Sequence, residues 1–126
     1  EEQLRLIHRH KTGALINAAI QMGGAAAQAD EVQCKALEAY AYGIGLVFQV
    51  VDDVLDVAGT AEQLGKPIGS DSENGKTTFA TLFGVDGAMQ LAEKLNDETC
   101  TALRDAFGEK SAFLEQLART LLNRRS

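Results

Sequence analysis

Three aspartates interrupt an otherwise apolar stretch of this sequence, residues 48–56, which reads FQVVDDVLD. At about 100° per residue in a helix, Gln49 and the three aspartates share one arc roughly 100° wide. Asp52 and Asp56 are i,i+4 neighbours, so their carboxylates can converge on one point. Like charges that close repel each other unless a cation lies between them. An all-oxygen ligand set with no His or Cys beside it suits Mg²⁺, and the stretch predicts a magnesium site at Asp52, Asp53 and Asp56.

The same acids are compatible with more than one role. Two or three carboxylates do not complete a Mg²⁺ shell, and this ion usually shares its coordination with water and substrate phosphates. A magnesium site here therefore implies a phosphorylated ligand. The acids also fit the solvated face of an amphipathic helix. A calcium loop is disfavoured, because the stretch lacks the alternating acids, central glycine and closing glutamate of an EF-hand.

A long helix is expected to carry the aspartates, from Asp30-Glu31, which resemble an N-cap and an acidic first turn, to about Ala58. Gly59 is expected to close it. Gly43 and Gly45 lie inside, where each costs up to ~1 kcal/mol relative to alanine; close helix packing, a passing substrate or a tolerated defect would explain them. The buried stripe follows the i, i+3, i+4, i+7 spacing and comprises Leu37, Tyr40, Ala41, Ile44, Val47, Phe48, Val51, Leu55 and Ala58.

Helical periodicity extends over most of the remaining sequence. We expect a first helix from Glu2 to about Met22 that ends or bends at Gly23-Gly24, with Ala25-Ala26-Ala27 as an alternative extension beyond the bend. Its apolar side is made of Leu4, Ile7, Ala14, Leu15, Ala18, Ala19 and Met22. Residues 60–76 are non-periodic and glycine-rich, with a possible short helical turn over 60–64. From Thr77 the helical pattern resumes, through Phe79, Leu82 and Phe83. Two further helices are expected, one capped by Asp86 and ending near Phe107, the other capped by Ser111. Their core candidates are Met89, Leu91, Ala92, Leu95, Leu103, Phe113, Leu114, Leu117, Leu121 and Leu122. No segment alternates with period two, so the fold class is all-α.

Composition narrows the possible functions of this 126-residue chain, which fits one domain. Its net charge of −6 argues against non-specific nucleic-acid binding, which needs a basic surface. Cys34 and Cys100 match no metal-ligand spacing and are expected to be reduced, semi-buried thiols of a cytoplasmic protein. No apolar run reaches the ~20 residues of a membrane span. Because residues 1–7 already have helical character and no initiator Met, we expect the chain to be a fragment of a longer protein.

Basic residues cluster in three places, from which they could bind an anionic ligand held by the aspartates through a metal ion. Lys66 and Lys76 bracket the glycine-rich segment, where they would reach a metal-bound diphosphate if that segment folds back over the aspartate helix. The second cluster lies on the first helix, and the third at the end of the chain. These two clusters contain Arg5, Arg9, Lys11, Arg124 and Arg125. Solvated lysines and arginines that complement a helix dipole are the alternative. His8 and His10, two residues apart, are expected on the polar face rather than as ligands.

The sequence resembles the trans-polyprenyl diphosphate synthases, specifically the bacterial farnesyl diphosphate synthase (geranyltranstransferase) type. The matching segments are KTGAL at 11–15, FQVVDDVLD at 48–56, GKPIGSD at 65–71 and GKTTF at 75–79, in the family's order and at its spacing. The resemblance implies an isoprenoid-synthase-type helical bundle of which residues 1–126 form the C-terminal half, with the first of the family's two aspartate-rich motifs absent. Phe79-Ala80 departs from a frequent Tyr-Pro, which removes a helix-shaping proline but no phosphate ligand.

Transferred position by position, the resemblance implies a role in the reaction for individual residues of this chain. Asp52 would bind Mg²⁺ directly, with Asp53 and Asp56 completing or orienting its shell. Thr12 and Gln49 would lie near the reacting allylic carbon, with Lys11 as the third catalytic residue. The diphosphate-binding set would be Lys11, Lys66, Lys76, Arg124 and Arg125, with Arg124 or Arg125 reaching isopentenyl diphosphate.

The implied reaction joins isopentenyl diphosphate to dimethylallyl or geranyl diphosphate to give farnesyl or a similar short-chain diphosphate. It would proceed by Mg²⁺-assisted ionisation, condensation and elimination in a homodimer. The 126-residue chain alone is expected to be inactive, because half of the metal cage is missing. The alternative is a non-catalytic helical interaction subunit, or a fragment that self-associates through exposed core.

Overall fold

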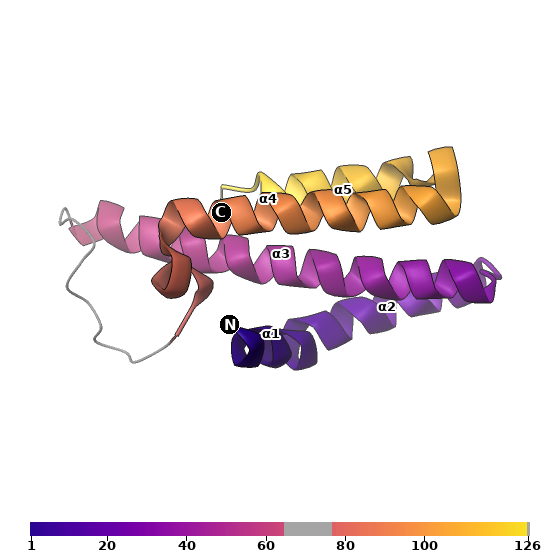
Figure 1. Ribbon diagram of the computed structural model, residues 1–126, viewed down its shortest axis with the longest axis horizontal. Helices are drawn as coiled ribbons and strands as arrows, with labels where there is room; N and C mark the ends of the chain where they lie inside the picture. Colours follow the sequence, from indigo (N-terminus) through magenta and orange to yellow (C-terminus); the bar gives the residue numbers. More distant parts are fainter. Residues whose placement is uncertain (65–76, 126) are drawn as a thin grey trace.

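The computed structural model describes residues 1–64 and 77–125, without the side chains of 60–64, and is all-α over this part of the chain. Its elements are α1 (Glu2–His8), the π-helical turn η1 (Arg9–Gly13), α2 (Ala14–Ala26), α3 (Glu31–Leu64), α4 (Phe79–Phe107), the 3₁₀ turn η2 (Gly108–Ser111) and α5 (Ala112–Leu122). The long helix α3 lies in the middle, with α1 and α2 along one side and α4 and α5 along the other (Figure 1). The predicted all-α class is confirmed. No helix among the described residues has the length and apolarity needed to cross a membrane.

Helix α3 begins where the sequence predicts but ends later. Asp30 and Gln33 form a reciprocal cap, in which Asp30 Oδ1 accepts from the Gln33 N–H at 2.8 Å and Gln33 Oε1 accepts from the Asp30 N–H at 3.0 Å. The expected end at Ala58-Gly59 is wrong, because the helix continues to Leu64. No other part of the described structure lies within 4 Å of the Gly59 Cβ position, so nothing displaces the chain there. A glycine alone weakens a helix by only about 1 kcal/mol.

The first helical segment differs from its prediction in register. It continues through Gly23-Gly24 and ends at Ala26, and Gln28, two residues beyond that end, has a φ of 56°. The π turn η1 inserts an extra residue, which rotates the following face relative to a regular helix. As a result Leu15 and Met22, predicted as core, are exposed, whereas Ile16 and Ile20 pack against the core. Ile7, which precedes the turn, is also exposed, so its assignment to the core is wrong.

Helix α4 is two helical pieces joined at a kink. Thr78 is its N-cap and forms a capping box with Thr81. Gly84, with φ 72° and ψ 170°, then breaks the helical geometry before the long second piece. The long second piece therefore begins beside Asp86, where the sequence predicts, although the structure records no capping bond from this side chain. The end is confirmed: Phe107 is the last helical residue, and Gly108 follows with φ 58°.

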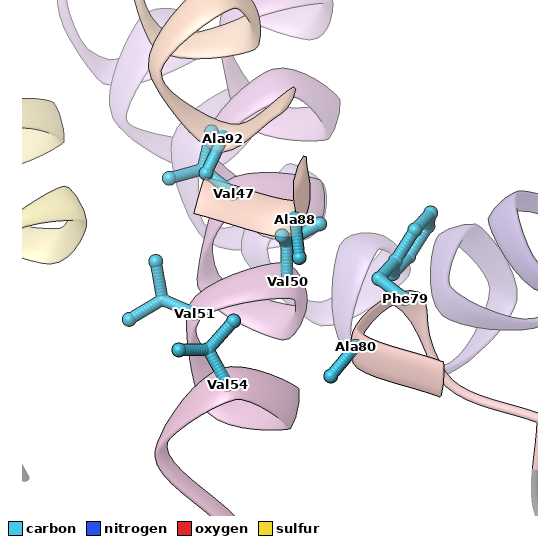
Figure 2. Close-up of a cluster of buried hydrophobic side chains, with 8 residues drawn as sticks. All are labelled: Val47, Val50, Val51, Val54, Phe79, Ala80, Ala88 and Ala92. Atoms are coloured by element: carbon cyan, nitrogen blue, oxygen red, sulfur yellow. The ribbon is translucent and has the colours of Figure 1, made fainter. Parts of the chain in front are cut away.

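The principal core lies where α3 packs against the two pieces of α4, on either side of the kink at Gly84. Figure 2 shows valines of α3 facing alanines and one phenylalanine of α4; the cluster consists of Val47, Val50, Val51, Val54, Phe79, Ala80, Ala88 and Ala92. Full burial of a valine or phenylalanine side chain contributes roughly 1.5–3 kcal/mol. The core therefore anchors the segment of α3 that carries the aspartates. Ala58, predicted as part of the buried stripe, is exposed.

Two glycines of α3 permit close helix packing, which is one of the roles that the sequence predicts for them. A Cβ at Gly43 would meet the side chain of Thr99 on α4, with Thr99 Cγ2 only 2.8 Å away. A Cβ at Gly45 would lie 3.2 Å from the Cα of Gly13 in η1. The second contact sets the distance between the aspartate helix and the segment that carries Lys11 and Thr12.

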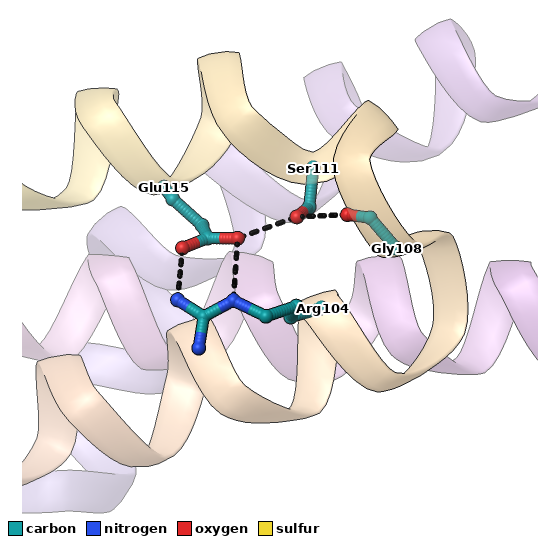
Figure 3. A network of polar contacts seen from close by, with 4 residues as sticks. All are labelled: Arg104, Gly108, Ser111 and Glu115. Atoms are coloured by element: carbon teal, nitrogen blue, oxygen red, sulfur yellow. Dashed lines mark hydrogen bonds and ion pairs between the residues drawn. The ribbon is translucent and has the colours of Figure 1, made fainter.

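At the other end of the bundle, a polar network joins α4 to α5. Glu115 accepts hydrogen bonds from Arg104, and the single hydroxyl proton of Ser111 is shared between Glu115 Oε1 and the Gly108 carbonyl oxygen, 2.5 and 2.6 Å from Oγ (Figure 3). Ser111 precedes α5 as predicted, but its hydroxyl caps no backbone N–H of that helix. On α5, Leu114, Leu121 and Leu122 pack against the core as predicted. Phe113 and Leu117 are exposed, which corrects their assignment to the core.

Candidate functional site

The three aspartates lie along one side of α3, close to the start of α4 and the end of α5. Asp52 and Asp53 are half-buried, and Asp56 is exposed. The carboxylates of Asp52 and Asp56 both raise the pKa of Asp53, as expected for charges that share one helix face. The predicted acidic surface therefore exists, and two of its members are tied to neighbouring elements.

Asp53 connects the acidic surface to α4. Its Oδ2 accepts a hydrogen bond from the backbone N–H of Phe79 at 2.9 Å, at the first residue of α4. This bond satisfies one of the donors that every helix leaves unpaired at its N-terminus. Burial is the largest influence on the pKa of Asp53 and raises it, while the Phe79 bond and the charge of His8 lower it; the net shift is upward. The carboxylate therefore benefits from added positive charge.

Asp52 is paired with Arg124, which follows α5. The two side chains meet at 2.6 Å between Arg124 Nη2 and Asp52 Oδ1. The same Nη2 donates to the Phe48 carbonyl at 3.2 Å, and the guanidinium lies 4.1 Å above the centre of the Phe48 ring. The sequence did not indicate this pairing. The predicted contact of Arg124 with isopentenyl diphosphate stays a prediction.

Gln49 and Thr12 meet between α3 and η1. Gln49 Nε2 donates to Thr12 Oγ1 at 3.1 Å, and Gln49 is buried. Thr12 sits in the π turn, a local geometry that is frequent at functional sites. The structure thus brings together two of the three predicted catalytic residues. Lys11, the third, is exposed in the same turn and has no recorded hydrogen bond or ion pair with a described residue.

His8 does not lie on the polar face as predicted. Its ring stacks on Phe79 with centroids 5.6 Å apart, and both ring nitrogens are buried without a hydrogen-bond partner among the described residues. The end of α1 meets the start of α4 here, which sequence periodicity did not reveal. His8 contributes positive charge that lowers the pKa of Asp53. His10 is exposed, as expected.

The remaining predicted diphosphate ligands are Lys66, Lys76 and Arg125. Lys66 and Lys76 lie outside the described residues, together with most of the two glycine-rich motifs that contain them. Arg125 is exposed beside Arg124. The diphosphate-binding role of this set therefore stays a prediction.

The donor set of the acidic surface fits a divalent cation of the Mg²⁺ type. All three side chains offer carboxylate oxygens, and Asp52 and Asp53 are partly exposed, so an ion with its own waters can reach them. Among the described residues, no group of three or more acidic, histidine or cysteine side chains forms a ready cluster. Asp52 Oδ1 is held by Arg124 and Asp53 Oδ2 by Phe79, so any metal site here has to be completed from further ligands or by displacement.

Two cavities lie elsewhere on the described part of the molecule. One of about 210 Å³ opens beside η1 and is lined by Arg5, His8, Arg9, Gly13, Tyr42 and Leu46. The other, about 720 Å³, lies at the junction of α4 and α5 beside Arg104 and Arg119. Although it is larger, the second cavity is remote from the aspartates, so we place the candidate chemistry on α3 instead.

A helical bundle with an acidic surface on its central helix defines the class, and comparison with known proteins defines the family. Residues 1–117 match the family model described as polyprenyl synthetase. The chain belongs to the polyprenyl synthetase family.

Known relatives support this assignment at the level of sequence and structure. The chain is 43% identical over 125 residues to a mitochondrial geranylgeranyl pyrophosphate synthase 10 of Arabidopsis thaliana, covering 99% of the chain and 36% of the relative. It is 41% identical over 123 residues to a geranylgeranyl diphosphate synthase of Cyanophora paradoxa, covering 98% of the chain and 41% of the relative. The crystal structure of a geranyltransferase from Helicobacter pylori matches with a TM-score of 0.69 and 35% identity, over 98% of the chain and 38% of that structure. The chain therefore spans less than half the length of these relatives.

Proposed function

We propose that the protein carrying this chain is a prenyltransferase, which joins isopentenyl diphosphate to an allylic diphosphate. The observation that carries the proposal is the convergence on one stretch of α3 of the carboxylates, the Gln49–Thr12 pair and the start of α4. The shared family and the names of its relatives support the same reaction class. Residues 1–126 would be the C-terminal half of the synthase domain.

Each described residue has a defined task in this proposal. Asp52 would bind Mg²⁺, and Asp53 and Asp56 would hold its shell. The bound Mg²⁺ would supply charge neutralisation for the departing diphosphate. Gln49, held by Thr12, would present a fixed polar group to the developing allylic cation, with less reorganisation than water would require. The buried apolar core beside these residues would help exclude water from the cation.

Lys11, Lys66 and Lys76 would bind the diphosphate, as the resemblance implies. Once the allylic carbon–oxygen bond has broken, the double bond of isopentenyl diphosphate attacks the allylic carbon. A proton is then lost, in the proposed scheme to the released diphosphate. Substrate positioning and electrostatic stabilisation carry such a reaction, and no nucleophilic side chain is needed.

The product would be farnesyl diphosphate or a similar short-chain diphosphate. Relatives named geranylgeranyl synthases, and a Marinomonas protein provisionally named a farnesyl-diphosphate synthase, bracket this range. The latter has a TM-score of 0.76 and 35% identity, over 97% of the chain and 40% of that structure. The homodimer and the cytoplasmic location stay predictions, since relatives include proteins named mitochondrial and chloroplastic.

The test is a prenyl-transfer assay on the protein at its natural length. Radiolabelled isopentenyl diphosphate is supplied with dimethylallyl, geranyl or farnesyl diphosphate in the presence of Mg²⁺, and products are separated by chain length. We expect elongation that stops in EDTA and falls at least a hundredfold in Asp52→Asn. The exposed Asp105→Asn is the matched control and should retain wild-type rates. No elongation with any of the three allylic substrates would refute the proposal.

The alternative is a helical module without catalysis, which pairs with a second copy of itself. It is favoured by the exposure of Leu15 and Met22, which are 74% and 73% exposed on α2 with no charged residue between Lys11 and Asp30. Light scattering on the 126-residue chain discriminates between the two. A dimer dispersed by Met22→Lys, together with no prenyl transfer by the longer protein, would favour the module; a monomer would exclude it.

A further inference from the structure

Arg124 is held against the acidic surface more firmly than the arginine of an exposed ion pair. Its side chain is only 18% exposed, against 46% for Asp52. The guanidinium is fixed from two directions, by the carboxylate and carbonyl that Nη2 contacts and by the ring of Phe48 beneath it. Phe48 and Asp52 are one helical turn apart on α3, so Arg124 lies along the helix across both.

The same contacts leave Arg124 incompletely satisfied. Its Nε is buried without a hydrogen-bond partner among the described residues. A buried donor without a partner is unfavourable, and an arginine in its preferred arrangement with a carboxylate would use two parallel bonds. Here Nη2 donates to two acceptors, whereas Nε has no acceptor among the described residues. The pairing is therefore strong enough to hold Arg124 in place but is not an optimised structural ion pair.

The oxygen that Arg124 contacts belongs to the residue proposed to bind the metal directly. A divalent cation and a guanidinium that share one carboxylate repel each other, so the two compete for Asp52. We propose that Arg124 is a built-in counterion of Asp52, which a divalent cation must displace to bind. The inference rests on the proposed function and adds regulation of the same site.

Displacement links the metal to the end of α5. A ligand that binds only the Arg124-released state has an affinity reduced by the fraction of molecules in that state. By reciprocity, metal binding loosens the hold on Arg124 by the same factor. The residues after Leu122 therefore become more mobile when the metal binds, and Arg124 becomes free to approach a diphosphate. While no metal is bound, Arg124 compensates the negative charge of Asp52.

The experiment measures Mn²⁺ binding to the natural-length protein by titration calorimetry, at fixed ionic strength and without substrate. Arg124→Gln removes the counterion, and we expect the dissociation constant to fall about three- to tenfold, the range of a partly exposed ion pair. Arg125→Gln removes an equal charge from the exposed neighbour and controls for long-range electrostatics. It should change the constant by less than about twofold. Arg124→Lys keeps the charge and should give an intermediate value.

Hydrogen exchange provides a readout independent of affinity. In the wild-type protein, saturating Mn²⁺ should speed exchange at residues 121–125, and in Arg124→Gln exchange there should already be fast and unaffected by Mn²⁺. An affinity that is unchanged or weakened in Arg124→Gln would overturn the inference, since Arg124 would then be structural or supportive of the site. No Mn²⁺ binding by any variant would overturn it together with the metal role of Asp52. If the protein transfers prenyl groups but Arg124→Gln leaves the Mn²⁺ affinity unchanged, the counterion role of Arg124 is refuted and the proposed function is not.

Discussion

The carboxylate of Asp53 in the middle of α3 accepts a hydrogen bond from the backbone N–H of Phe79, 26 residues later, at 2.9 Å. The bond fixes the start of α4 against the acidic surface. Phe79 is 0% exposed, so the polar side chain of Asp53 helps to hold a fully buried residue in place. One member of the acidic surface thus has a structural task beside its proposed chemical one.

Asp53→Ala is expected to lower the free energy of unfolding by about 1–2 kcal/mol, because it leaves the Phe79 N–H without an acceptor. Asp53→Asn is the matched variant. Its amide oxygen can still accept this bond, so its stability should stay within about 0.5 kcal/mol of wild type. Urea unfolding followed by circular dichroism gives both values. Equal stability of the alanine and wild-type proteins would show that the bond contributes nothing.

Gly43→Ala is expected to destabilise the protein by about 1–3 kcal/mol, because the new Cβ would overlap the side chain of Thr99. Gly59→Ala makes the same change in the same helix, where no atom of the described residues outside the helix backbone lies within 4 Å of the new atom. It should stabilise the protein by up to about 1 kcal/mol through helix propensity. Thermal unfolding of the two variants tests the pair. Effects of the same sign would contradict the packing found at Gly43.

The stability of the α4–α5 junction is expected to depend on pH through Glu115. Hydrogen bonds from Arg104 and Ser111 hold the pKa of this carboxyl below its ordinary value. A group with a lowered folded-state pKa contributes stability above its unfolded pKa and loses it as pH falls through the folded value. The difference in unfolding free energy between wild type and Glu115→Gln should therefore be present at pH 7 and shrink from about pH 5 downward. The exposed Glu109→Gln removes the same charge from η2 and serves as the matched control.

Thr12→Val is expected to lower kcat by up to about a hundredfold with little change in KM, because Gln49 loses the acceptor that orients its amide. Thr12→Ser keeps the hydroxyl and should retain most activity. Steady-state prenyl-transfer kinetics of the two variants measures the effect. If valine and serine behave alike, the hydroxyl has no positioning role, and the 3.1 Å contact is structural only.

Much of the fold could be predicted because the deciding signals are local. The Asp30 cap, the apolar stripe around Val47 and the positive-φ glycine after Phe107 each show in a few neighbouring residues. The failures arose where distant segments decide the outcome. The spacing of apolar residues assigned Leu15 and Met22 to the core, because the local sequence does not indicate the extra residue that a π turn inserts.

The candidate site could be predicted in its residue types but not in its contacts. The spacing of Asp52, Asp53 and Asp56 indicated an acidic surface, and the Gln49–Thr12 bond joins two residues that the resemblance assigns to one site. The Arg124–Asp52 pair joins residues 72 positions apart, and nothing in the local sequence of either predicts it. Long-range pairing of this kind follows from how α5 packs beside α3, which only the folded structure reveals.

The central claim is that the acidic surface of α3 holds a metal-bound diphosphate. It is tested most directly by calorimetric binding of a bisphosphonate, a stable diphosphate analogue, to the natural-length protein with and without Mg²⁺. We predict binding that requires Mg²⁺ and weakens at least about tenfold in Asp52→Asn, since a neutral amide is a poor ligand for this hard cation. Binding of equal strength in EDTA, or in the Asp52→Asn variant, would contradict the account.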